Sequence, residues 1–117
     1  MNRSLKIAAA FAAFMIPAVA FAHHGWSSYD AKTTIKHSAK LTDLTWGNPH
    51  GAAKVVYQNK TWDVVLAPVT RMEQRGLTRD MLAPDKTVTI EGYPRIDGTA
   101  EMRIERVIAA GKTVELR

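Results

Sequence analysis

The stretch TTIKHSAKLTDLTW, residues 33–46, decides the fold of this chain. Its apolar residues alternate with polar ones, which is the pattern of a β-strand with one buried face. The alternation changes parity along the stretch: first Ile35, His37, Ala39 and Leu41, then Leu44 and Trp46. A change of parity indicates a bulge, because one extra residue turns the following side chains to the other face. We therefore predict one long strand that bends near Asp43.

Downstream of this bend, the sequence predicts a hairpin, a short helix and a second set of strands. Pro68 suits the first position of a helix, and Gly76 suits the position just after its end. Asp97 followed by Gly98 is a strong turn signal between two alternating segments. The expected elements are strands over 52–58 and 61–67, a helix over 68–76, strands over 86–95 and 100–108, and a return strand over 113–117.

This order of elements predicts a mostly β fold. It matches a small Greek-key barrel of five to six strands, like the oligonucleotide/oligosaccharide-binding (OB) fold, with one short helix between strands 3 and 4. A first strand that bends is expected in such a barrel, because that strand turns a corner. A β-sandwich and an open half-barrel remain alternatives.

The first 22 residues have the features of an export signal. Arg3 and Lys6 precede an apolar run over 7–16, which is too short to span a bilayer. The triplet AFA at 20–22 predicts cleavage after Ala22, and the triplet AVA at 18–20 offers a rival site after Ala20. We therefore predict a cleaved signal peptide over 1–22, a single OB-like barrel domain over 23–117, and a periplasmic location.

Composition and motifs exclude several classes of function. The net charge of the chain is +5, and it falls to +3 once the two basic residues of the predicted signal are removed. These charges are spread along the chain, so we expect no nucleic-acid partner. No stretch after residue 22 is apolar enough to span a membrane, so we expect no membrane span after cleavage. Cysteine is absent. The sequence contains no Gly-x-Ser-x-Gly elbow, no phosphate-binding glycine loop and no His-Glu-x-x-His, and we therefore expect no enzyme.

Four blocks of the sequence resemble those of a family of small exported bacterial proteins of uncharacterised function. The blocks are HHGWSSYD (23–30), WGNPH (46–50), LAPVTRMEQRGL (66–77) and GYPRIDGTAEMRIERV (92–107). The resemblance implies export and a single domain, and it implies no activity. At the level of fold, the chain is also similar to the periplasmic copper/silver chaperone of bacterial metal-efflux systems, but no residue of that protein matches here in spacing.

Histidines at the predicted mature terminus suggest a copper site. If His23 is the first residue, its amine and its ring can chelate one metal ion, and a second imidazole completes a three-nitrogen set that suits copper. The second imidazole would come from His50, from His37 or, less favourably, from the adjacent His24. Trp26 would shield such a site. The first hypothesis is therefore a periplasmic copper carrier or sensor.

The second hypothesis is a non-metal ligand-binding or adaptor domain that docks on a periplasmic or membrane protein. Its surface would include Trp26, Trp46, Asn48 and Tyr93, which are residue types that bind partners as well as pack. The charges over 101–106 alternate in sign, and we predict that they form a solvated face. Three methionines could bind Cu(I) through sulfur, but we expect them to fill the core: Met72, Met81 and Met102.

Overall fold

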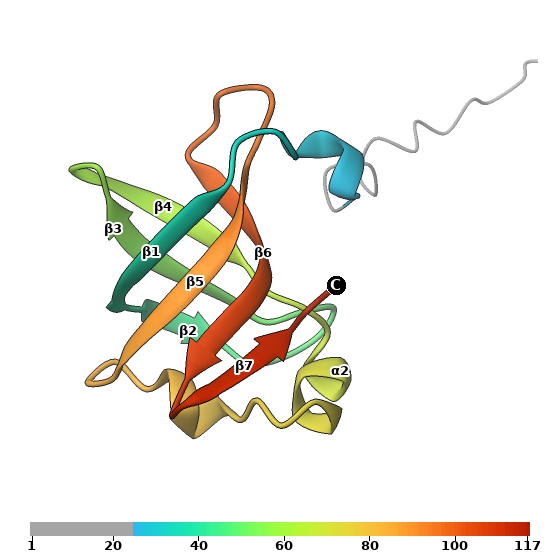
Figure 1. The fold of residues 1–117 in the computed structure, drawn as a ribbon, viewed down its shortest axis with the longest axis vertical. Helices are drawn as coiled ribbons and strands as arrows, with labels where there is room; N and C mark the ends of the chain where they lie inside the picture. Colours follow the sequence, from blue (N-terminus) through green and yellow to red (C-terminus); the bar gives the residue numbers. More distant parts are fainter. Residues whose placement is uncertain (1–24) are drawn as a thin grey trace, which may run out of the picture.

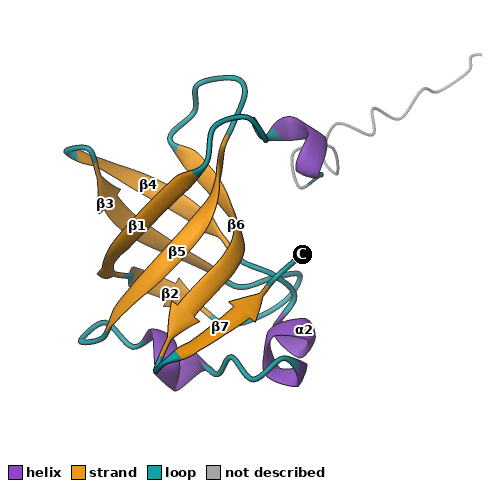
Figure 2. Ribbon diagram, viewed as in Figure 1, coloured by secondary structure: helices purple, strands orange, loops and turns teal. Residues whose placement is uncertain are grey.

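Seven strands, one short α-helix and two 3-10 turns make up residues 25–117, which are the residues described by the computed structural model (Figures 1 and 2). The predicted signal peptide and the histidines at 23 and 24 lie outside this part. In chain order the elements are η1 (Trp26–Ser28), β1 (Ile35–Lys40), β2 (Thr42–Thr45), β3 (Ala52–Tyr57), β4 (Lys60–Val65), α2 (Val69–Gln74), η2 (Arg79–Leu82), β5 (Thr87–Pro94), β6 (Glu101–Ala109) and β7 (Lys112–Glu115).

The predicted bend near Asp43 is confirmed. Only Leu41 separates β1 from β2, and Leu41 is fully buried at the corner. Asp43 has a φ of 49°, in the left-handed region, and the register of β2 against β3 shifts between Thr42 and Thr45. These irregularities let the chain leave the neighbourhood of β5 and continue beside β3.

This bend curls the sheet round on itself. The strand order is β1-β5-β6-β4-β3-β2, and β7 adds to β6. The two ends of this order, β1 and β2, are consecutive in the chain, so the corner joins the two edges (Figure 1). The pairing of β4 with β6 is parallel and every other strand pairing is antiparallel. The mostly β, OB-like fold with a helix between the third and fourth strands is therefore confirmed, where β1 and β2 count as one bent strand.

The helix α2 ends where the sequence predicts. Gly76 has a φ of 90°, its N–H donates to the Glu73 carbonyl, and the Leu77 N–H donates to the Met72 carbonyl. This pair of hydrogen bonds is a Schellman cap, and Leu77 is buried over it. No helix within residues 25–117 is both long and apolar enough to cross a bilayer.

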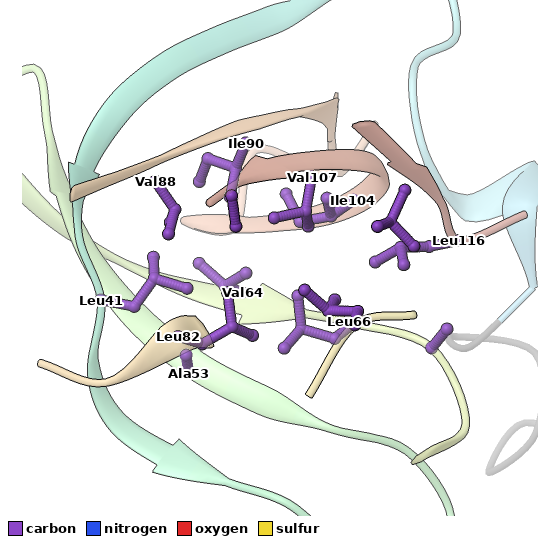
Figure 3. Close-up of a cluster of buried hydrophobic side chains, with 14 of the residues drawn as sticks. Leu41, Ala53, Val64, Leu66, Leu82, Val88, Ile90, Ile104, Val107 and Leu116 are labelled. Carbon is purple, nitrogen blue, oxygen red and sulfur yellow. The ribbon is translucent and has the colours of Figure 1, made fainter. Parts of the chain in front are cut away.

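The core fills the inside of the curled sheet (Figure 3). Met72 and Met102 are fully buried in it, which confirms their packing role. The segment with α2 and η2 covers the lower end of the sheet in Figure 1. The largest fully buried side chains are Leu41, Leu66, Met72, Leu77, Leu82, Ile90, Met102, Ile104 and Leu116.

A second irregularity lies between β5 and β6. Glu91 is opposite Arg106 and Gly92 is opposite Ile104, so Glu105 is an extra residue on β6. A Cβ atom on Gly92 would lie 2.1 Å from the Arg103 carbonyl oxygen, so only glycine fits there. The bulge sends two charged residues in succession to the outer face of β6, beside the site described below.

Candidate functional site

Five side chains meet on the outer face of β5 and β6, and we call them the Trp26 cluster. They come from η1, β5, β6 and the residue that follows Leu116 at the end of the chain. The Trp26 ring is the centre: the Arg103 Cζ atom lies 4.4 Å from its centroid and the Arg117 Cζ atom lies 4.7 Å from it. The Tyr93 ring meets it edge-on at 6.3 Å. The members are Trp26, Tyr93, Arg103, Glu105 and Arg117.

The lead-in segment before β1 brings Trp26 to this face. It adds to the end of the β5–β6 hairpin, because the Asp30 N–H donates to the Pro94 carbonyl and the Ile96 N–H donates to the Ser28 carbonyl. Tyr29 is the buried residue of this segment, and its hydroxyl donates to Glu101 at 2.7 Å. Burial, and then this hydrogen bond to a carboxylate, raise the pKa of the Tyr29 phenol.

The C-terminal segment reaches the same face from the other side. The Leu116 N–H donates to the Glu105 carbonyl at 2.7 Å, at the bulge of β6. Two arginines of the α2 region hold this segment through its carbonyl oxygens: Arg71 donates to Leu116, and Arg75 donates to residues 115 and 117. The α2 region therefore fixes the backbone on which Arg117 stands.

Glu105 is the one carboxylate of the cluster, and its neighbours already use it. It accepts a short hydrogen bond from the Tyr93 hydroxyl, which raises the pKa of the Tyr93 phenol. It also lies 4.0 Å from an Arg117 nitrogen. Neither contact involves Arg103.

Arg103 is the exception in the cluster, because no carboxylate among residues 25–117 forms an ion pair with it. Its Nη1 atom is buried and has no hydrogen-bond partner among residues 25–117. Burial, and then the charges of Arg71 and Arg117, lower the pKa of this guanidinium. Of the other arginines among residues 25–117, Arg79 forms no ion pair but is exposed to water, and Arg71 and Arg75 donate to the backbone carbonyls of residues 115–117. Arg95 pairs with Asp97 and Glu101, Arg106 pairs with Glu91 and Glu115, and Arg117 pairs with Glu105.

A half-buried guanidinium with unmet donors is suited to hold an oxyanion. Its N–H groups match the geometry of carboxylate and phosphate oxygens, and the bonds that result are among the stronger ones in proteins. Arg117 adds a second positive charge on the same ring, and the faces of Trp26 and Tyr93 offer apolar contact. The arrangement can therefore recognise a negatively charged group that carries an apolar body.

The two described histidines lie at opposite ends of β3. The His37 Nε2 atom lies 2.9 Å from the Val56 carbonyl, whereas His50 precedes the strand and its Nδ1 atom lies 2.8 Å from the Gly51 carbonyl. They are separated by about 16 Å of strand. His37 connects β1 to β3, so its contact is structural. Within residues 25–117, no three side chains of histidine or acidic residues gather as a metal-binding group.

The four residues of the predicted partner surface divide between two places. Trp26 and Tyr93 are in contact in the cluster. Trp46 instead ties the β2–β3 loop to α2, since its Nε1 atom donates to Glu73 at 3.2 Å and its ring packs against the core. Asn48 is exposed in the same loop.

The prediction of a solvated face over 101–106 is wrong. Arg103 and Glu105 are half-buried, because η1 and the C-terminal segment cover this part of β6. One signal for the bulge was present in the sequence: two charged residues in succession separate Ile104 from Val107, which breaks the alternation. The sequence contains no comparable signal that Arg103 would lack an ion pair among residues 25–117.

The model of a family of unknown function (DUF6152) matches residues 12–103. The match begins within the segment predicted as the signal peptide and ends at Arg103 in β6. No curated protein matches the chain.

Proposed function

The chain belongs to this family of unknown function, DUF6152, and we propose that it is a small exported binding protein that holds an anionic group at the Trp26 cluster. The observation that carries the proposal is the buried Nη1 atom of Arg103, which has no hydrogen-bond partner among residues 25–117. The ligand class is a carboxylate or phosphate group. It belongs to a small molecule or to a docking partner, in keeping with the ligand-binding and adaptor hypothesis.

The energetics of burial support this proposal. A buried donor without a partner costs about 1–3 kcal/mol of folding free energy, and a charged donor costs more. The neighbouring charges of Arg71 and Arg117 add repulsion, as the lowered pKa of Arg103 reflects. An oxyanion that binds here would supply an acceptor for Nη1 and offset the positive charge of the neighbouring arginines, and both effects favour binding.

We assign binding rather than catalysis because the cluster consists of cations, aromatic faces and one carboxylate already shared by two neighbours. These groups recognise and orient a ligand. The predicted signal supports a location outside the cytoplasm, and the periplasmic location is part of the proposal.

The test is a titration followed by NMR. Inorganic phosphate and acetate are added separately to the exported chain at constant ionic strength, and the side-chain signals of Arg103 and Trp26 are followed. We expect saturable shifts that Arg103→Gln abolishes. Arg79→Gln is the matched control, because it removes an exposed arginine without an ion pair, and it should leave the shifts unchanged. Wild-type shifts that persist in Arg103→Gln would refute the proposal.

Copper binding at the mature terminus is the second candidate function. One observation bears on His50 as a ligand: a carbonyl only accepts, so the Nδ1 atom that faces the Gly51 carbonyl carries a proton. Metal-binding histidines are commonly oriented in this way. His23 would supply its amine and ring.

Copper affinity of a chain that begins at His23 tests this second candidate. One extra residue ahead of His23 separates the amine from that ring, and affinity should fall by several orders of magnitude. His50→Ala should weaken it as well. Equal affinity in the extended chain, or a mature start at Phe21, would exclude this site.

A further inference from the structure

The unpaired nitrogen of Arg103 is out of contact with solvent. Its Nη1 atom is buried, and the Trp26 ring lies over the guanidinium, with 4.4 Å between the ring centroid and Cζ. An oxyanion therefore cannot reach this nitrogen in the conformation described here. A group that lies against the guanidinium must move first, and the indole of Trp26 is such a group.

Among residues 25–117, Trp26 meets the sheet through its ring, and the backbone hydrogen bonds to the sheet come from residues that follow it. The hydrogen bonds to the β5–β6 hairpin begin at Ser28, whose carbonyl accepts from Ile96, and continue at Asp30. The backbone bonds of residues 25 and 26 stay within their own turn, at Ser28 N to Gly25 O and Tyr29 N to Trp26 O. Rotation about the backbone near residue 28 can therefore lift the indole while the strands stay paired.

We infer that Trp26 is a gate over an oxyanion site at Arg103. In the closed state the indole ring of Trp26 lies over the guanidinium of Arg103. In the open state residues 25–27 turn about Ser28, and a carboxylate or phosphate oxygen takes the place of the indole. This inference rests on the proposed function, and it adds that the ligand competes with a residue of the chain itself.

The gate predicts an unusual effect of removing an aromatic residue from a binding site. Trp26→Ala removes the competitor, so phosphate or acetate should bind Arg103 about tenfold more tightly than in the wild type, the factor expected for the loss of one cation–π contact. Trp26→Phe retains a ring face and should stay close to the wild-type affinity. Trp26→Ala combined with Arg103→Gln should bind neither anion.

The experiment is the same NMR titration, applied to these variants with phosphate and with acetate in separate arms. Amide spectra first confirm that each variant keeps the fold, which is expected because the core contains no residue of η1. The relative affinity in the two arms distinguishes a phosphate from a carboxylate ligand.

The outcomes separate the gate from the function. Tighter binding in Trp26→Ala, lost in the double variant, supports the gate. Weaker binding in Trp26→Ala than in the wild type would overturn it and make Trp26 a wall of the site, while the proposed function stands. Absence of binding in both the wild type and Trp26→Ala would overturn the gate and the proposed function together.

Discussion

Substitution of Gly92 by alanine tests whether the β5–β6 bulge holds the site and the fold together. The new Cβ atom would lie 2.1 Å from the Arg103 carbonyl oxygen, 2.8 Å from its carbon and 2.9 Å from the Ile104 Cα atom. All three atoms belong to the backbone of β6, which cannot rotate aside as a side chain can. The two strands must therefore separate by about 1 Å to restore ordinary van der Waals contact.

The magnitude follows from this separation. Overpacking of this kind costs about 1–3 kcal/mol, and the loss of one or two ladder hydrogen bonds adds about 1 kcal/mol for each. We expect the free energy of unfolding to fall by about 3–4 kcal/mol, out of about 5–14 kcal/mol for a domain of this size. The melting temperature should fall by about 15–25 °C.

Thermal and urea unfolding followed by circular dichroism measure this change. Gly47→Ala is the matched control: a Cβ atom there meets nothing within 4 Å, and its φ is not in the left-handed region, so its effect should stay within about 0.5 kcal/mol. A Gly92→Ala variant that melts within a few degrees of the wild type would refute the claim that only glycine fits at the bulge.

Three further predictions follow from the described contacts. Arg103→Met removes an unpaired, half-buried cation, so thermal unfolding should show an unchanged or higher melting temperature while the anion-induced NMR shifts disappear. His37→Phe loses the contact with the Val56 carbonyl, and urea titration should show a loss of about 1 kcal/mol. The folded state raises the pKa of the Tyr29 and Tyr93 phenols, so it keeps protons that the unfolded chain loses near pH 10. The contribution of these phenols to stability should therefore be constant from neutral pH to about pH 10 and fall above it, and unfolding measured across this range should show less of the fall in Tyr29→Phe. A melting temperature that stays level through pH 11 would contradict this sign.

The fold could be predicted because its controlling features are local in sequence. The alternation over 33–46 gives a strand, and the change of parity gives the corner where Asp43 adopts a positive φ. Pro68 and Gly76 bracket the helix for reasons of backbone geometry alone, and the observed Schellman cap follows the same rule. Closure of the sheet then follows from the corner, because a bent strand can pair with two partners.

The site could be predicted only in part, because it depends on contacts between distant segments. Residue type alone predicts that Trp26 and Tyr93 belong to a binding surface, and their rings are in contact in the structure. The buried Nη1 atom of Arg103 could not be predicted from residue type. An arginine on an alternating strand normally reaches water or an acidic neighbour. Here η1 covers it from one side and Arg117 lies on the same ring, and neither neighbour is visible from local sequence.

The irregular features of this structure have different physical explanations, and the difference is the reason for placing the site at Arg103. The positive φ of Asp43 and the bulge at β2 let one strand close the sheet, so the fold itself accounts for them. The glycine at 92 and the bulge at Glu105 likewise curve the long β5–β6 pair. The buried nitrogen of Arg103 is different, because methionine or leucine could cover the same surface without the loss of hydration. The cation–π contact with Trp26 gives one reason for a guanidinium at this position, but it leaves Nη1 without an acceptor among residues 25–117. Under the proposed function, an oxyanion that exchanges with the indole of Trp26 supplies that acceptor.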